Sequence, residues 1–331
     1  MSERVCAIVV TYNRKALLVE CLETIRKQTR PVDAIYIIDN ASTDGTPELL
    51  LEKGYIKKPP PANVLEPWEN KFEINNLTDG GSIEVYYVRM HENTGCSGGF
   101  YEGVKRAYER GYDWLWLMDD DIEPDIDCLK NLLKCFYKDN SLLVVTPAKL
   151  FKEGWIGGGT ILQDLSNPFW RRKKYFCITG AFYSFDDAKR VLNSLPEIIY
   201  VDDVPFEGPL IKKDVVKLVG YPNKDLFICR DDTEYSIRIK QKGKLAIATR
   251  ALVKRKLLEG NKSNMKRYYY VRNHAYTDRV YGKNFLVRHI RPFIYMILYI
   301  GKAITMRQFN MIGKYIKATI YGYLKKLGLN Y

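Results

Sequence analysis

The chain has 331 residues, of which 46% are hydrophobic and 27% are charged. This balance is typical of a globular protein with a full core and excludes collagen-like, disordered and disulfide-stapled small proteins. The net charge of +13 is unevenly placed, because residues 266–331 contain thirteen Lys or Arg and a single acid, Asp278. A basic C-terminal segment on a nearly neutral body favours an anionic partner, either lipid head groups or nucleic acid.

Apolar runs alternate with helical patterns over the first 150 residues. The runs predict strands over residues 5–10, 34–38, 83–88, 114–118 and 142–145. Helical spacing predicts helices over residues 16–27, just after Thr46, from the glycine-rich turn at 93–99 to Arg110, and over 128–137. We interpret residues 55–82, which hold proline and glycine clusters, as an insertion or long loop. The alternation predicts an α/β fold, with an open and mostly parallel sheet flanked by helices.

Residues 151–265 are less regular. Gly157, Gly158 and Gly159 predict a turn, and helices are expected near residues 212–219 and over 231–242. From residue 266 the pattern changes to helices rich in Tyr, Ile and Lys or Arg. The seven cysteines form no C-x-x-C pair and there are three histidines, which argues against a zinc cluster and for thiols in a reducing compartment.

Four polar clusters directly follow predicted strands, at residues 11–14, 39–40, 93–99 and 119–121. In a parallel sheet the carboxyl ends of the strands share one edge, and ligands bind there. We therefore expect these four clusters, which are far apart in the sequence, to converge on one site.

The triplet Asp119-Asp120-Asp121 is the strongest single signal. Three adjacent carboxylates repel one another, so a fold keeps them only with a cation or with exposure to water. Residues i and i+2 of an extended turn point the same way, so Asp119 and Asp121 could grip Mg²⁺ or Mn²⁺. The alternative is a solvated acidic turn, but the position after a buried strand favours the metal site.

Two further clusters suggest binding and proton transfer. The pattern Asn93-x-Gly95-x-x-Gly98-Gly99 resembles a phosphate or sugar loop, although a dinucleotide fingerprint would follow the first strand, which argues against a dehydrogenase. Residues 231–234 place three acids at a predicted helix start. One acid is enough to cap a helix, so another could serve as a general base.

Five motifs together carry a family resemblance: V-V-T-Y-N-R (9–14), I-I-D-N-A-S-T-D-G-T (37–46), N-T-G-C-S-G-G-F (93–100), L-M-D-D-D-I-E-P (117–124) and L-F-I-C-R-D-D-T-E-Y-S-I-R (226–238). In this order they resemble the inverting family 2 glycosyltransferases of the GT-A fold, in particular the galactofuranosyl- and rhamnosyltransferase branch. The resemblance covers roughly residues 4–275, with R-Y-Y-Y-V-R-N at 267–273 included. It implies a catalytic domain at 1–265, with a nucleotide-sugar half (1–150) and an acceptor half (151–265).

The resemblance also implies residue roles. The nucleotide-sugar donor would be bound by Thr11, Tyr12, Asn13, Arg14, Asp39, Asn93, Gly95, Gly98, Gly99 and Asp120. Asp119 and Asp121 would hold Mn²⁺ or Mg²⁺ on the diphosphate, and Asp232 would be the catalytic base. Glu207, Gly208 and Asp231 would contact the acceptor.

One departure from the family pattern concerns the metal. Relatives often supply a histidine ligand near residue 250, where this chain has cations at 251–256. Either the metal has two protein ligands, or Lys254 or Arg255 neutralises the diphosphate. A solvated basic loop is the alternative.

The resemblance implies transfer of a sugar to a growing, lipid-linked cell-surface glycan. Two other functions stay open: a nucleotidyltransferase, which would normally place its glycine-rich loop after the first strand, and a non-catalytic module that binds nucleotide sugars or membranes.

Residues 312–327 place apolar side chains at helical spacing, with lysines off that stripe. Such a basic amphipathic helix can lie in a membrane interface. With no signal peptide and no apolar run long enough to span a bilayer, we expect peripheral attachment to the cytoplasmic face of a membrane. The stripe could instead pack on the body or on a second copy in a homo-oligomer. Nucleic acid is not expected, since no recognised nucleic-acid module is present.

Overall fold

The computed structural model describes residues 3–169, 173–258 and 263–331. The described strands are β1 (Val5–Thr11), β2 (Ala34–Asp39), β3 (Trp68–Asn75), β4 (Ser82–Arg89), β5 (Trp114–Asp119), β6 (Ile122–Pro124), β7 (Leu142–Leu150), β8 (Ile156–Gln163), β9 (Lys173–Ile178), β10 (Ile198–Val201), β11 (Leu210–Lys212) and β12 (Lys244–Arg255). The described helices are α1 (Lys15–Arg26), α2 (Thr46–Glu52), α3 (Gly95–Glu109), α4 (Cys128–Lys138), α5 (Phe185–Leu192), α6 (Asp214–Val219), α7 (Asp231–Lys240), α8 (Asn264–Tyr281), α9 (Phe285–His289), α10 (Arg291–Thr305) and α11 (Ile312–Tyr323), with 3₁₀ turns η1 (Lys224–Leu226) and η2 (Phe309–Met311).

The strands form one mixed sheet with the main order β10-β12-β7-β11-β5-β1-β2-β4-β3. Pairing is parallel between β1 and both β2 and β5, between β2 and β4, and between β7 and β12. Antiparallel strands lie at both ends of this order and at β11. The predicted α/β fold is confirmed, and the ends of β1, β2 and β5 meet at one edge as expected.

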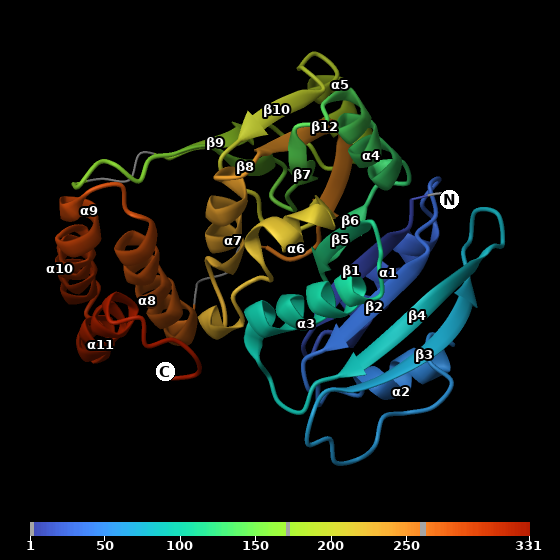
Figure 1. Ribbon diagram of the computed structural model, residues 1–331, viewed down its shortest axis with the longest axis horizontal. Helices are drawn as coiled ribbons and strands as arrows, with labels where there is room; N and C mark the ends of the chain where they lie inside the picture. The colour runs from blue at the N-terminus through green and yellow to red at the C-terminus, as the bar shows by residue number, and fades with distance from the viewer. Residues whose placement is uncertain (1–2, 170–172, 259–262) are drawn as a thin grey trace.

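Both faces of the sheet are covered, which explains the continuous apolar runs. Along β1, Val5, Ala7 and Val9 face a core built with α1, α2 and α4. The intervening Cys6, Ile8 and Val10 face a second core, built with α3, α5, α6 and α7. Figure 1 shows the helices above and below the twisted sheet.

Two sequence predictions in the loop regions are wrong. The segment 55–82 is not all loop, because β3 pairs antiparallel with β4 along its full length and closes the sheet edge. The glycines at 157–159 lie inside β8 and do not form a turn. A Cβ on Gly159 would stand 2.3 Å from the carbonyl oxygen of Asp203, so glycine here permits close strand packing.

The C-terminal helices gather at one end of the molecule, on the side of α7 and away from the β3–β4 hairpin (Figure 1). They share a small core in which Tyr268 and Tyr269 of α8 pack with Met311 and Tyr315. The helix predicted over 312–327 is the shorter α11, and its apolar stripe is divided. Tyr315 and Thr319 are buried, whereas Ile316, Ile320 and Leu324 are 39–53% exposed. Within the described residues, no helix is both long and apolar enough to cross a bilayer.

Candidate active site

Three adjoining cavities run from the sheet edge to α8. The strand-end cavity, about 340 Å³, lies at the carboxyl ends of β1 and β5 and is lined by Val10, Thr11, Tyr12, Arg14, Asn40, Asn93, Gly95, Cys96, Asp119, Asp120, Phe227, Ile228, Met265 and Lys266. Six of the ten residues predicted to bind the donor are in this list. The four polar clusters converge as the sequence predicted, and the C-terminal half contributes Phe227, Ile228, Met265 and Lys266.

Asp120 ties the first strand end to the acidic triplet. Its carboxylate, 2% exposed, accepts hydrogen bonds from the Thr11 hydroxyl (2.7 Å) and from Arg14 (3.0 Å). Burial raises the pKa of Asp120 to about 6, although the Arg14 charge opposes this shift. These contacts hold Asp120 in the wall of the strand-end cavity, next to Asp119.

The two predicted metal ligands lie differently: Asp119 lines the strand-end and central cavities, whereas Asp121, 4% exposed, lines none of the three. Burial, with the charges of Asp121 and Asp120, raises the pKa of Asp119 well above its usual range, and a bound cation would relieve this repulsion. Among the described residues no cluster of three His, Cys, Asp or Glu could hold a metal. Two carboxylates suit an ion whose remaining ligands are phosphate oxygens and water.

Two neighbouring cations at the end of β12, Lys254 and Arg255, have different surroundings. Arg255 lies 3.6 Å from Asp121 and 3.5 Å from Glu207, so its charge stands at the predicted metal pair. Lys254 instead donates to the carbonyl of Tyr183 and lines none of the three cavities. Of the two cations that the sequence left open, the structure brings Arg255 to the site.

Four residues predicted to bind the donor lie outside the cavity lining and have packing or loop roles. Asn13 joins the β1 and β2 ends by hydrogen bonds to Ser42 and Thr43. Asp39 is fully buried and accepts from Tyr87, Arg89 and the Ser42 amide. A Cβ on Gly98 would collide with Thr94, the N-cap residue of α3, so glycine makes room for that side chain. A Cβ on Gly99 would collide with Val10 of β1, so Gly99 lets α3 approach the sheet.

The central cavity, about 290 Å³, connects the two ends of the site. It shares Cys96 and Asp119 with the strand-end cavity and shares Lys149, Pro205, Cys229, Arg230 and Asp232 with the third cavity; Phe100, Phe206, Glu207, Asp231 and Arg255 complete its wall. Asp119 and Asp232, 113 residues apart in the sequence, therefore face one space.

Asp232 has the environment of a base. It lies in the first turn of α7, half-buried, and accepts a hydrogen bond from the Thr233 amide. Burial, with the charges of Asp203 and Asp231, raises the pKa of Asp232 to about 7. A general base with a pKa near the working pH is effective and still largely available. The neighbouring Asp231 is 4% exposed and receives the Cys96 thiol at 3.3 Å, which ties α7 to α3.

The loop at residues 205–209 places Glu207 in the central cavity, where it pairs with Lys149. Gly208 lines none of the three cavities. It adopts φ +101°, and its carbonyl accepts from the Trp116 indole at 2.9 Å. Gly208 thus shapes the loop that carries Glu207, whereas Glu207 and Asp231, both predicted acceptor residues, line the central cavity.

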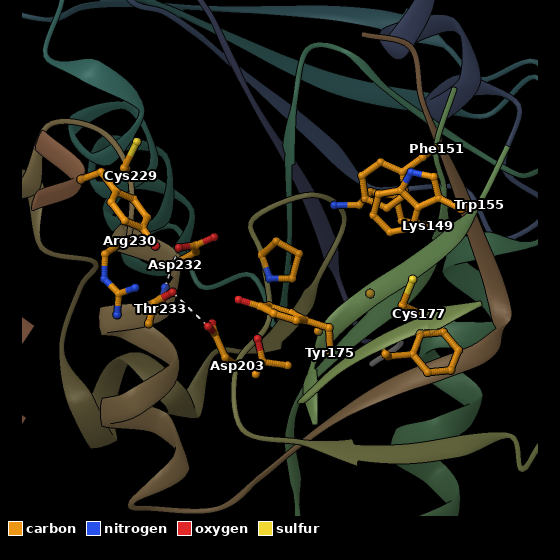
Figure 2. A pocket seen from close by; sticks show the side chains of 16 residues that line it. Lys149, Phe151, Trp155, Tyr175, Cys177, Asp203, Cys229, Arg230, Asp232 and Thr233 are labelled. Atoms are coloured by element: carbon orange, nitrogen blue, oxygen red, sulfur yellow. Dashed lines mark hydrogen bonds between the residues drawn. The ribbon is translucent and has the colours of Figure 1, made fainter. Parts of the chain in front are cut away.

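The hairpin cavity, about 630 Å³, lies between the β8–β9 hairpin, α7 and α8. Figure 2 shows Asp203, Arg230 and Asp232 on one side and the stacked rings of Phe151 and Trp155 on the other. Those rings are 3.5 Å apart at their centroids and nearly parallel. The sequence analysis did not identify Phe151, Trp155, Tyr175 or Asp203, which lie in none of its motifs. It quoted Arg230 and Tyr270 within motifs at 226–238 and 267–273 but gave neither a role.

The loop before α7 is strained and is held from α8. Phe227, Cys229 and Arg230 all have positive φ, between 61° and 68°, which non-glycine residues rarely adopt. The Asn273 amide nitrogen lies 2.7–3.0 Å from the carbonyl oxygens of Leu226, Ile228 and Cys229. Residues 267–273, part of the family resemblance, thus position the loop that carries Asp232.

Comparison with known proteins shows which family this chain resembles. The model of glycosyl transferase family 2 matches residues 6–80 and 71–188. Galactofuranosyltransferase GlfT1 of Mycolicibacterium smegmatis is 28% identical over 243 residues, which cover 73% of this chain and 67% of that protein. GlfT1 of Mycobacterium tuberculosis is 26% identical over 255 residues, with 73% and 66% covered. The matched part thus spans about two thirds of these relatives.

Solved structures show the same fold. A mannosyltransferase, PcManGT from Pyrobaculum calidifontis in complex with GDP-Man and Mn²⁺, aligns with a TM-score of 0.54 at 15% identity, over 98% of this chain and 88% of that one. GalNAc-T7 with UDP, GalNAc and Mn²⁺ aligns with a TM-score of 0.55 at 18% identity, over 84% and 50%. With a family match across more than half of its residues and a GT-A fold, this chain belongs to the family 2 glycosyltransferases and is related to their galactofuranosyl branch.

Proposed function

We propose that this protein transfers galactofuranose from a nucleoside diphosphate to a hydroxyl group of a growing cell-surface glycan, with inversion at the anomeric carbon. The observation that carries the proposal is the central cavity, which Asp119 and Asp232 both line. A nucleotide in the strand-end cavity would present its sugar to Asp232. The similarity to GlfT1 supports galactofuranose, and rhamnose is the alternative sugar. Family membership favours glycosyl transfer over nucleotidyl transfer.

The chain's own residues account for the proton transfer. Asp232 accepts the proton of the acceptor hydroxyl while that oxygen attacks the anomeric carbon, and the nucleoside diphosphate leaves toward Asp119. Its pKa of about 7 makes Asp232 a stronger base than an exposed carboxylate. Arg14 and Lys266 add positive charge to the wall of the strand-end cavity, where the diphosphate would lie.

Asp119 and Asp121 would hold a Mn²⁺ or Mg²⁺ ion in this proposal. The bound ion supplies Lewis-acid stabilisation of the charge that develops on the leaving diphosphate. Arg255 adds a fixed positive charge beside Asp121, at the place where relatives often have a histidine.

A lipid-linked acceptor at an anionic membrane is part of the proposal, and α10 supports it better than α11 does. The α10 face consists of Ile290, Ile294, Ile297, Leu298, Gly301 and Ile304, which share one side of the helix by their spacing. Ile297 and Leu298 are 65% and 58% exposed, and Ile290 and Ile304 are 43% and 50% exposed. Figure 1 shows α10 at the outer edge of the molecule. This apolar strip suits burial at the level of lipid head groups.

The positive charge of the C-terminal segment favours an anionic lipid surface, and not a second copy of the chain, as the partner of the α10 face. Ten Lys or Arg and no acid follow Asp278 in the sequence. Two copies that met through the α10 face would bring these charges together, whereas an anionic leaflet would attract them. The protein would thereby be held where a lipid-linked glycan is available.

Vesicle flotation tests the membrane part. We expect wild-type protein to float with phosphatidylcholine vesicles that contain phosphatidylglycerol, and Ile297→Glu to stay in the soluble fraction. Leu65→Glu is the matched control, since Leu65 is 93% exposed between α2 and β3, on the sheet side of the molecule. Equal flotation of the Ile297 and Leu65 variants would refute the role of the α10 face.

Turnover of activated sugars tests the reaction itself. The full-length protein is incubated with UDP-galactofuranose and with a rhamnose donor, each with and without Mn²⁺ or Mg²⁺, and released nucleotide is measured. We expect metal-stimulated release with one donor. Absence of release with every donor, from a protein whose melting temperature rises with UDP, would instead favour a binding module.

A further inference from the structure

Arg230 is a buried cation on the wall of the hairpin cavity. The residue is 6% exposed, and within the described part of the chain its Nε and Nη2 atoms have no hydrogen-bond partner. Its guanidinium carbon lies 5.9 Å from the centroid of the Tyr270 ring, which stabilises a cation without satisfying its N–H groups. A buried guanidinium with unpaired donors is costly, so a missing anionic partner is the simplest explanation.

The position of Arg230 is built by the fold. Its backbone is held in the left-handed region, at φ 65°, directly before α7. Asn273 and Arg272 of α8 donate to the carbonyls of the preceding residues, Leu226 included. Backbone strain of this kind persists only where surrounding contacts enforce it, and it is concentrated at functional sites.

Arg230 acts on Asp232 only at a distance, where its charge lowers the pKa of that carboxyl against the stronger effect of burial. Within the described residues, no ion pair of 4.0 Å or less joins it to Asp203 or Asp232. Asp203 accepts from the Thr233 hydroxyl at 2.9 Å. The other cations nearby are engaged, since Lys149 pairs with Glu207 and Arg255 lies between Glu207 and Asp121. The free charge therefore stands beside the base and on the side away from the strand-end cavity.

We propose that Arg230 binds an anionic group of the acceptor, a phosphate or a carboxylate, next to the hydroxyl that Asp232 deprotonates. This inference rests on the proposed function and narrows the acceptor to charged saccharides. A guanidinium presents paired N–H donors that match both anions in a two-point contact. Arg230 lines the hairpin and central cavities but not the strand-end cavity, which assigns it to the acceptor and not to the nucleotide. A sugar phosphate and a uronic acid share this chemistry.

Binding of three small saccharides tests the site. Glucose 1-phosphate, glucuronate and methyl glucoside are titrated calorimetrically into full-length protein saturated with UDP, which occupies the nucleotide site. We expect one of the two anions to bind ~10–100-fold more tightly than the neutral sugar, the worth of hydrogen bonds to a charged group. The tighter of the two identifies phosphate or carboxylate as the group recognised.

Substitutions of Arg230 test whether this residue causes the preference for an anionic saccharide. In Arg230→Gln we expect the preference for the anion to disappear while the affinity for UDP is unchanged. Lys217→Gln is the control, because it removes one positive charge from the exposed surface of α6. If Arg230→Gln does not fold, Arg230→Lys is used, and loss of the two-point contact should lower the preference several-fold. An unchanged preference, or a parallel loss of UDP affinity, overturns the proposal.

The outcomes separate this inference from the proposed function. Sugar-nucleotide turnover without any preference for anions would refute the role of Arg230 and leave the transferase intact. An Arg230-dependent preference without turnover of any donor would leave an anion site in a protein that is not an active transferase.

Discussion

The strand-end cavity and the hairpin cavity are built in different ways. The first lies where parallel strands end, and ten of its fourteen lining residues lie at or just after the ends of β1, β2 and β5 or at residues 93–96. The second combines the β8–β9 hairpin, the loop before α7 and a side chain of α8. In the proposed function, the nucleotide end therefore depends mainly on regular sheet geometry, with Phe227 and Ile228 of the strained loop in its wall. The acceptor end depends on that loop and on the distant contacts that hold it. The two ends should respond differently to substitution.

We expect the largest effects from substitution of one carboxylate at each end of the site. Asp232→Asn should lower kcat by about 10²–10⁴-fold, the usual contribution of a general base, while the nucleotide still binds. Asp119→Asn should also weaken UDP binding in the presence of Mn²⁺, since in the proposal Asp119 lines the strand-end cavity and holds the ion on the diphosphate. Turnover and calorimetric binding of UDP measure both. Loss of UDP affinity in the Asp232 variant would contradict the assignment of Asp232 to the acceptor end.

The pH dependence of turnover tests the same base in the unmodified protein. With a pKa of about 7, Asp232 is mostly protonated below this pH and mostly ionised above it. Since the ionised form accepts the proton, kcat/KM should fall about tenfold for each pH unit below about 7 and level off above it. UDP affinity, measured over the same range, is the control for the nucleotide end. A profile that is flat down to about pH 5 would exclude Asp232 as the group that titrates.

A smaller effect is expected at the contact between α8 and the strained loop. Asn273→Ala leaves the carbonyls of Leu226, Ile228 and Cys229 without their shared donor. We expect a loss of about 1–3 kcal/mol in the free energy of unfolding and a drop in turnover, because Asp232 follows this loop. Denaturant unfolding and donor turnover measure the two effects.

Thr277→Ala is the matched control for Asn273. Thr277 is also buried in α8, but its hydroxyl bonds to the Asn273 carbonyl of the same helix. It should lose some stability with little change in turnover per folded molecule. If both variants lose stability and turnover in the same proportion, α8 supports the fold in general and does not position the loop.

This contrast also explains what the sequence could and could not predict. The strand-end cavity follows from local patterns, because each apolar run forms a strand and each polar cluster lies at its end. Thr11, Arg14, Asn93 and Asp119 were found in this way. Asp39 also lies at a strand end but lines none of the three cavities, because Tyr87 and Arg89 of another strand bury its carboxylate.

The hairpin cavity depends on pairs that no local pattern reveals. Gly159 was interpreted as part of a turn because its packing partner, the carbonyl of Asp203, lies 44 residues away. The contact of Asn273 with residues 226–229 likewise spans more than 40 residues. Asn273 lies in a stretch that contributed to the family resemblance, but its role requires the fold.

The smallest expected effect concerns the stacked pair Phe151 and Trp155, which forms the wall of the hairpin cavity opposite Asp232 (Figure 2). A flat aromatic surface can pack against the apolar face of a sugar ring without contacting the reacting atoms. Trp155→Ala should therefore raise the acceptor KM by roughly three- to tenfold and leave kcat and UDP affinity nearly unchanged, as expected for binding that is equal in the ground and transition states.

Two control variants test whether the effect of Trp155→Ala comes from loss of the aromatic ring at this position. Trp155→Phe keeps a flat surface and should restore most of the acceptor affinity. Tyr137→Ala, on the exposed side of α4, removes an aromatic ring outside all three cavities and should leave KM unchanged. If Trp155→Ala lowered kcat and left KM unchanged, the ring would act on the reacting geometry. The acceptor end would then be one coupled unit, in which the wall and the base cannot be varied independently.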